Sequence, residues 1–338
     1  MEKTSSQPIP VTLITGLLGS GKTTAINSLL QQKPKNETWG LLINELGKVG
    51  IDSLVLQTTQ QPIEVVSGGC ICCSAAFGYQ QALQSLLKQP LQRILIEPTG
   101  LGHPAKIIDT LRKFQPTVKL EQTLCMVTPQ QLTPDFWQKS AVLRDLVSLA
   151  DRLLLNKVDT ATEAELSQAK ATLNQGYPAN PNPIFTLHGN PIDNKITDWL
   201  TQPAKRPFYR LEGIEQHQQL TQQHPLTVTT SLSHCITLEV FTGDTSSIGW
   251  QFSPTVQFNR VALKAFLKHT PHLIRAKSIL RTGNEWQHLN HLPNQTSFED
   301  IAWRQDSRLT LLLDQPLNIE QVSKLEQNLT KIVRNCDD

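Results

Sequence analysis

The chain has 338 residues, of which 38% are hydrophobic and 18% are charged. This length favours two domains, and the apolar content excludes a largely disordered chain. The formal net charge is only +2 and no dense run of Lys and Arg occurs, so we expect no nucleic-acid partner.

The N-terminal segment does not combine a basic start with a long apolar stretch and a cleavage site. We therefore expect no signal peptide and no membrane span, hence a cytoplasmic protein without a membrane partner.

In the first half of the chain, short apolar segments rich in β-branched residues alternate with segments of helical spacing. Strands are predicted at 11–15, 39–45, 93–99, 123–128, 152–159 and 183–189, and helices at 23–32, 82–89, 104–114, 140–150 and 164–175. Near-continuous apolar strands between helices favour an α/β fold in which helices cover both faces of a parallel sheet. We assign residues 1–204 to this domain and expect its ligand at the carboxyl ends of the strands.

The pattern changes at residues 205–225, which are polar, lack apolar periodicity and are predicted to form a linker. Beyond them, strands are predicted at 234–242, 273–282, 285–292 and 308–313, and helices at 260–270 and 319–333. These elements indicate a smaller α+β domain at residues 226–338.

The strongest motif is GLLGSGKTT at residues 16–24, which fits G-x-x-x-x-G-K-[ST] and lies between a predicted strand and a predicted helix. Glycines let backbone N–H groups surround phosphates, and the positive end of the following helix points at them. Lys22 would reach the β- and γ-phosphates, and the Thr23 hydroxyl would bind Mg²⁺. The predicted nucleotide contacts are Gly16, Leu17, Leu18, Gly19, Ser20, Gly21, Lys22, Thr23 and Thr24.

The second motif is NKVD, at the end of the predicted strand 152–159. The Asp159 carboxylate can accept two hydrogen bonds from guanine, a donor pair that adenine lacks. Asn156 can bond the base edge, and the Lys157 stem can pack on the ring. After the last strands of such a domain, the motif favours GTP over ATP.

The third motif is ILIEPTG, in which a strand ends near Glu97. A carboxylate at this place can hold the water shell of Mg²⁺ or orient a water molecule. The Gly100 N–H could sense the γ-phosphate. The alternative is a strand that merely ends in an acid.

The fourth motif is GGCICC, which places Cys70, Cys72 and Cys73 within four positions. In a reducing cytosol such a cluster indicates metal or redox chemistry more often than crosslinking. Two or three of these sulfurs can bind one soft ion such as Zn²⁺ or Cu⁺, and the spacing leaves a coordination position for an outside ligand. The alternative is a set of buried, inert cysteines.

Five motifs, namely GLLGSGKTT, INELGKVGID, GGCICC, ILIEPTGLGHP and NKVD, occur in the order found in the CobW-type GTPases, relatives of the urease and hydrogenase accessory GTPases, which the chain therefore resembles. The C-terminal region is similar to the CobW C-terminal domain in AFLKHTPHLIRAKSILRT, EWQHLNHL and IAWRQDSRLTLLL. The resemblance covers nearly the whole chain.

The resemblance implies GTP hydrolysis coupled to the handling of a transition metal, often zinc. It implies that the three cysteines bind the metal, that Glu97 is the Walker-type acid, and that residues 44–52 form a switch loop. The candidate switch residues are Asn44, Glu45, Asp52 and His103. Two features depart from the family pattern: Lys48 stands where relatives usually have Glu, and histidines are sparse.

We expect GTP with Mg²⁺ to order the segments at 44–52 and 99–103 and so to bring the cysteines into metal-binding geometry. Hydrolysis would weaken the metal site and pass the metal to a client protein, with the chain a monomer or a nucleotide-dependent dimer. Turnover should be slow, because no water-positioning Gln or arginine finger is evident. Two alternatives stay open: a GTP-dependent regulatory switch with structural cysteines, and an accessory GTPase for cobalt, cobalamin or metalloenzyme assembly.

Overall fold

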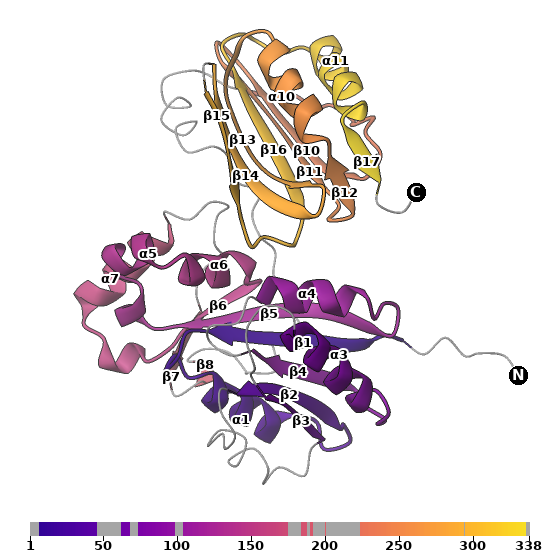
Figure 1. Cartoon of the computed structure of the whole chain (residues 1–338). Helices are drawn as coiled ribbons and strands as arrows, with labels where there is room; N and C mark the ends of the chain where they lie inside the picture. Colours follow the sequence, from indigo (N-terminus) through magenta and orange to yellow (C-terminus); the bar gives the residue numbers. More distant parts are fainter. Residues whose placement is uncertain are drawn as a thin grey trace, which may run out of the picture. The chain divides into compact units, whose positions relative to one another are not determined.

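The computed structural model describes residues 7–45, 62–67, 74–98, 104–174, 184–187, 190–191, 200, 224–293 and 295–335. The chain divides into two compact units, Met1–Pro207 and Phe208–Asp338 (Figure 1). Most of the predicted linker lies outside the described residues, and its last two residues form the short strand β9 (His224–Pro225). The exact domain boundaries stay a prediction.

The first unit is built on one sheet of eight strands in the order β3-β2-β4-β1-β5-β6-β7-β8. The strands are β1 (Ile9–Gly16), β2 (Trp39–Glu45), β3 (Ile63–Ser67), β4 (Arg93–Glu97), β5 (Val118–Val127), β6 (Arg152–Leu155), β7 (Ile184–Leu187) and β8 (Asn190–Pro191). The pairs from β3 to β7 are parallel, and only β8 runs antiparallel to its neighbour.

Helices connect these strands and cover both faces of the sheet (Figure 1). They are α1 (Lys22–Gln32), α3 (Ser74–Leu86), α4 (Pro104–Arg112), α5 (Pro134–Lys139), α6 (Ala141–Leu149) and α7 (Glu163–Leu173), with the short turns η2 (Pro129–Gln131) and η3 (Val158–Thr160). Alternate residues of β5 enter opposite cores: Met126 packs with Ile26 and Leu29 of α1, whereas Val127 packs in a second cluster with residues of α6. The predicted α/β class, with a parallel sheet covered on both faces, is confirmed.

The second unit is an antiparallel sheet of seven strands in the order β15-β14-β13-β16-β11-β10-β9. Its other strands are β10 (Cys235–Thr242), β11 (Ser246–Phe252), β13 (Leu273–Thr282), β14 (Glu285–Leu292), β15 (Gln295–Asp300) and β16 (Ser307–Leu313), and β12 (Val256–Phe258) pairs separately with β17 (Val333–Asn335). The helices α10 (Arg260–His269) and α11 (Ile319–Thr330) lie along one face (Figure 1). The predicted smaller α+β domain is confirmed.

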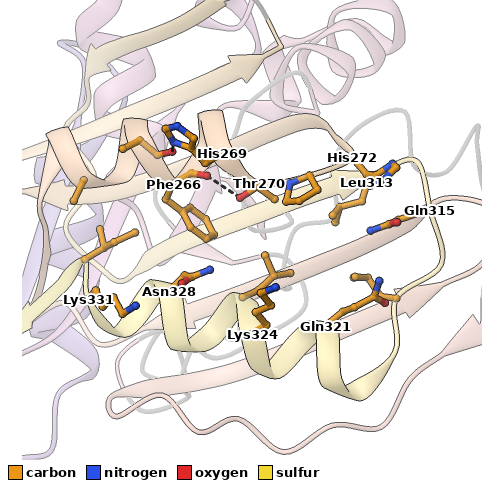
Figure 2. A pocket seen from close by; sticks show the side chains of 16 residues that line it. Phe266, His269, Thr270, His272, Leu313, Gln315, Gln321, Lys324, Asn328 and Lys331 are labelled. Carbon is orange, nitrogen blue, oxygen red and sulfur yellow. Dashed lines mark hydrogen bonds between the residues drawn. The ribbon is translucent and has the colours of Figure 1, made fainter.

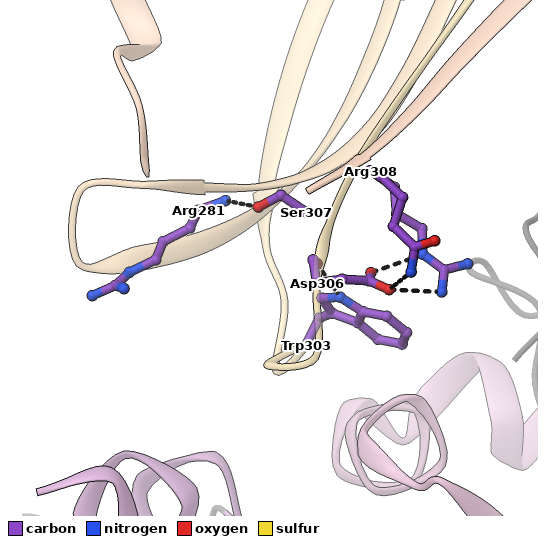
Figure 3. Close-up of polar contacts among 6 residues, drawn as sticks. Arg281, Trp303, Asp306, Ser307 and Arg308 are labelled. Atoms are coloured by element: carbon purple, nitrogen blue, oxygen red, sulfur yellow. Dashed lines mark hydrogen bonds and ion pairs between the residues drawn. The ribbon is translucent and has the colours of Figure 1, made fainter. Parts of the chain in front are cut away.

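A buried ion pair holds the start of β16. Arg308 Nε lies 2.8 Å from Asp306 Oδ1, and Arg308 Nη2 donates to Asp306 Oδ2 at 2.9 Å (Figure 3). The Trp303 indole donates to the Asp306 carbonyl, and Gln251 of β11 donates to the Asp306 carboxylate. Because both charges are buried and each has several partners, the desolvation cost is offset and the turn before β16 is held in one geometry.

Several predictions of elements differ from the structure. The strand predicted at 152–159 ends at Leu155, and the elements α5, β8, β9, β12, β15 and β17 were not predicted. The helix predicted at 82–89 is α3, which begins earlier, at Ser74, and ends at Leu86. Gly78 of this helix lies close to β3, since a Cβ there would lie 3.0 Å from Val66 Cγ1. The strands β3 and β11 were not predicted; in β11, serines and a glycine obscure the apolar pattern of a strand that is almost entirely buried. The strand predicted at 123–128 is longer and begins at Val118.

Among the described residues, no helix combines the length and apolar character that crossing a bilayer requires.

Candidate functional site

The carboxyl ends of the parallel strands place the predicted motifs along one edge of the sheet. The loop at 16–24 follows β1, Glu97 ends the neighbouring strand β4, and NKVD follows β6. In open α/β sheets, ligands bind at this edge, where loops from adjacent strands meet.

Two glycines of the 16–24 loop are required by both backbone conformation and space. Gly16 has a φ of +141°, and a Cβ there would lie 2.2 Å from the Met126 carbonyl oxygen. Gly21 has a φ of +100°, and a Cβ there would lie 2.3 Å from Asn156 Nδ2. Gly19 also has a positive φ but lies in open space. The loop therefore keeps its backbone against β5 and NKVD only while these positions lack side chains.

The start of α1 leaves its backbone N–H groups open to a ligand. Its N-cap is Gly21, which provides no side-chain hydrogen bond, and its first turn has no acidic residue. Every other α-helix whose N-cap residue is described has a side-chain cap, from Thr133, Ser140, Thr162, Asn259 or Asn318. An uncapped helix start with its positive dipole end is a site for an anion.

Lys22 and Glu97 meet beside this helix start, and both are buried. Lys22 Nζ donates to the Leu17 carbonyl at 3.2 Å and lies 3.9 Å from Glu97 Oε1. In this position the ammonium group is held by the loop itself, so it must turn outward to contact a phosphate. The structure thus brings together a lysine and a carboxylate that lie 75 positions apart in the sequence.

The hydroxyl-bearing residues of the first turn of α1 remain accessible. Thr23 is half-buried and Thr24 is exposed, whereas Ser20 is buried. At the tip of the loop, Leu18 is 90% exposed, and its carbonyl accepts a hydrogen bond from Gln131 Nε2 at 3.2 Å. No local pattern indicated this contact, because η2 and the loop lie far apart in the chain and meet only in the folded sheet.

Asn156 is the residue of NKVD that holds the loop. It is 1% exposed; its Nδ2 donates to the Ser20 carbonyl at 3.0 Å, and its Oδ1 accepts from Thr186 Oγ1 at 2.9 Å. Lys157 has a φ of 58° and begins η3, and Lys157 and Asp159 are both exposed. The base contacts predicted for Asn156, Lys157 and Asp159 stay a prediction, whereas the bridge from Ser20 to Thr186 is a role that sequence patterns did not indicate.

Several predicted site residues lie outside the described part of the chain. They are Cys70, Cys72, Cys73, Gly100, Asp52 and His103, and of Asn44 and Glu45 only the backbone is described, in β2. Within the described residues, no group of three His, Cys, Asp or Glu side chains could hold a metal ion.

The two described cysteines are poor metal ligands. Burial raises the pKa of Cys125 to about 12, and burial also raises the pKa of Cys235 above its ordinary value. Because the thiolate is the form that binds metal, burial disfavours metal binding at both thiols. The predicted metal-binding role therefore stays with the 70–73 motif.

Two zinc chaperones are among the curated proteins that the chain resembles. The chain is 40% identical over 189 residues to the zinc chaperone YeiR of Escherichia coli strain K12, covering 55% of this chain and 57% of that protein. It is 31% identical over 196 residues to the zinc chaperone YjiA of the same strain, covering 55% of this chain and 59% of YjiA. The chain spans about half the length of the curated relatives it matches.

Among solved structures, the Zn(II)-bound YjiA GTPase from E. coli aligns with a TM-score of 0.44 and 18% identity, covering 97% of this chain and 99% of that chain. The family model described as the CobW/HypB/UreG nucleotide-binding domain matches residues 10–182, a little over half of the chain. This match begins with β1 and includes the 16–24 loop, Glu97 and NKVD. The chain therefore belongs to the CobW/HypB/UreG family.

Proposed function

We propose that this protein is a GTP-hydrolysing metallochaperone that binds zinc at Cys70, Cys72 and Cys73 and delivers it to a client protein in a nucleotide-dependent way. The observation that carries the GTPase part is the uncapped start of α1, with Lys22 and Glu97 beside it. The names of the relatives YeiR and YjiA, both zinc chaperones, support the choice of metal. The proposal includes a cytoplasmic location, and a monomer or nucleotide-dependent dimer.

Different residues at the carboxyl ends of the parallel strands would bind the phosphates and the base of GTP. The N–H groups of the 16–24 loop and of the first turn of α1 donate to the phosphate oxygens, and Lys22 leaves the Leu17 carbonyl to contact them. Asp159, exposed within η3, pairs with guanine, and the hydrogen bond from Asn156 to the Ser20 carbonyl connects the loop to this turn.

The donors near α1 fit a magnesium ion. Thr23 offers a hydroxyl and Glu97 a carboxylate, and oxygen is the ligand that Mg²⁺ prefers. When bound, Mg²⁺ would neutralise charge on the phosphates. Glu97, held near Lys22, would orient the attacking water or the water shell of the ion.

The position of β3 supports a link between the nucleotide and the cysteines. β3 ends at Ser67 and α3 begins at Ser74, so the two elements that flank the motif meet the same edge as the 16–24 loop. β3 lies three strands from β1 in the sheet, a lateral separation of about 14 Å at the usual strand spacing. This separation is short enough for one ordered segment to connect the two sites.

Zinc titration in two nucleotide states tests the proposal. We expect zinc affinity to differ by at least about tenfold between the protein loaded with GDP and with a non-hydrolysable GTP analogue, which corresponds to about 1.4 kcal/mol of coupling. Cys72→Ser should abolish tight zinc binding, whereas Cys235→Ser should leave it unchanged.

Other outcomes of this titration separate the alternatives. Equal zinc affinity in both states would favour a regulatory switch with structural cysteines. A site that prefers cobalt in both states would favour cofactor or metalloenzyme assembly. Replacing Asp159 by Asn should shift the preference from GTP to xanthosine triphosphate if this residue reads the base.

A further inference from the structure

A groove in the second unit lies between α10 and α11, and its lining includes none of the residues predicted to bind the nucleotide or the metal (Figure 2). Its volume is about 600 Å³, within the usual range for a binding pocket. Apolar side chains of the domain core form much of its lining, and most of them are almost fully buried. They include Phe266, Leu313, Leu317, Leu325 and Ile332.

Two small side chains on α10 leave part of the space in the groove. Ala262, Ala265, Phe266 and His269 all line it, at the spacing that places residues on one face of a helix. Two of these four are alanines, and Ala265 is exposed. Larger apolar residues at these positions would fill the space between the helices, so the volume follows directly from the residue choice.

The rim of the groove is basic. Lys324 and Lys331 line it from α11 and its end, and both are exposed. His272 also lines it and is bound to Asp314 through Nδ1 at 2.9 Å. None of the described residues that line the groove is a carboxylate. The two lysines lie seven residues apart, about 10 Å along a helix axis, so a single anionic group would not pair with both.

Carboxamides add hydrogen-bonding capacity along the rim. Gln315 and Asn328 lie towards opposite ends of the groove (Figure 2). Each carboxamide offers both donors and an acceptor, as a peptide backbone does. A fatty acid or another single-headed amphiphile has polar groups at one end only, so this distribution fits a polypeptide better.

We propose that the groove binds a segment of a partner protein that carries apolar side chains flanked by Asp or Glu. The apolar side chains enter the floor, the acidic residues pair with Lys324 and Lys331, and the backbone bonds the carboxamides. The identity of the partner rests on the proposed function: it is the client protein that receives the metal. The second unit binds this client, and the first unit binds GTP and zinc.

Selection from a random twelve-residue peptide library displayed on phage tests the groove on the full-length protein. We expect enriched peptides to combine at least two large apolar residues with at least two acidic ones. Synthetic copies should bind the wild-type chain in fluorescence anisotropy. Ala265→Trp, which fills the groove from an exposed position, should weaken binding at least tenfold.

The double variant Lys324→Glu with Lys331→Glu should weaken peptide binding by a similar factor, although it leaves the apolar lining of the groove unchanged. Lys268→Glu is the matched control, since Lys268 is exposed on α10 but does not line the groove, and it should change affinity less than twofold. Circular dichroism verifies that all variants are folded.

Three results would overturn the proposal: no peptide enriched over the Ala265→Trp protein, enriched peptides without acidic residues, or equal binding to the groove variants. Binding of dodecanoate without any enriched peptide would identify an amphiphile site, and a dimer that Ala265→Trp dissociates would identify a second copy as the occupant. Either result would also contradict the proposal.

GTP hydrolysis and zinc affinity of the groove variants should match wild type. If peptide binding holds while the zinc experiment fails, the docking site stands and only the client assignment falls.

Discussion

Helices α1 and α11 both begin a few residues after a strand, but only α11 has side chains that bond the N–H groups of its first turn. In α11, the Asn318 side chain accepts from Gln321 N at 2.9 Å and the Gln321 side chain accepts from Asn318 N at 2.9 Å, which is a complete capping box. In α1, Gly21 caps nothing. A helix that serves only the fold satisfies its own donors, whereas a helix that serves a ligand leaves them for the ligand.

This comparison predicts that changes at the start of α1 affect activity and that changes at the capping box and the buried face of α11 affect stability. The largest effect should come from Lys22→Ala. We expect GTP hydrolysis to fall by at least about 10²-fold, because the variant lacks the cation that would contact the phosphates and stabilise the charge that develops on them. Single-turnover hydrolysis with circular dichroism as a folding control measures this. Lys35→Ala, at an exposed position, is the control and should retain wild-type activity. A Lys22→Ala protein with wild-type activity would show that this lysine is not needed for hydrolysis.

The next effect should come from Glu326→Ala on α11. The Glu326 side chain is buried and accepts hydrogen bonds from Thr230 Oγ1, from the backbone N and Oγ of Ser231, and from Trp250 Nε1. Loss of this acceptor leaves the buried Trp250 indole N–H without this partner and removes the bonds from the half-buried Thr230 and the exposed Ser231, so we expect a loss of about 3 kcal/mol in the free energy of unfolding of the second unit.

Urea unfolding followed by Trp fluorescence measures the effect of Glu326→Ala. Glu320→Ala is the matched control, because Glu320 lies on the same helix but is exposed. Nucleotide affinity should be the same in both variants. A Glu326→Ala protein of wild-type stability would show that the network contributes little.

A smaller effect is expected from Asn318→Ala, which removes the capping box of α11. The free energy of unfolding should fall by about 1 kcal/mol, the usual cost of losing an N-cap side chain. GTP affinity and hydrolysis should not change. Thermal melting compared with wild type measures the loss, and an effect on nucleotide binding instead would contradict the division of roles between the two helices.

The smallest effect concerns pH, and it too belongs to the second unit. Burial lowers the pKa of both His288 and His291 below the ordinary value of 6.5. The unfolded chain therefore binds protons that the folded chain does not, so this contribution to stability is present above about pH 6.5 and is lost as the pH falls through the folded pKa values. Urea unfolding at pH 7.5 and at pH 5.5 measures the loss in the free energy of unfolding, and His291→Gln should make this loss smaller. An equal loss in His291→Gln and wild type would show that His291 does not contribute to it.

Much of the nucleotide edge could be predicted from consecutive residues. A strand, a glycine loop, a lysine and a helix are contiguous in the chain, and their backbone conformations are set by neighbours a few positions away. The same holds for NKVD and for the strand that ends at Glu97. The α/β class followed from alternating apolar segments, since strands buried on both faces need apolar residues at every position.

The parts that could not be predicted depend on contacts between distant residues. The strand β11 was missed because its burial comes from β10 and β16 on either side rather than from its own pattern. The link between Gln131 and the Leu18 carbonyl joins residues 113 positions apart, and no local signal indicates it.

The sequence by itself determined the phosphate-binding motif, the cysteine motif, the family and the two kinds of fold, because each is encoded in short runs of residues or in their periodicity. Only the tertiary structure decided that Asn156 connects Ser20 to Thr186, that Lys22 rests beside Glu97, and that two alanines open a groove in the second unit. Hydrogen bonds and cavities of this kind are set by the distances between packed elements, and a linear pattern contains no such distances.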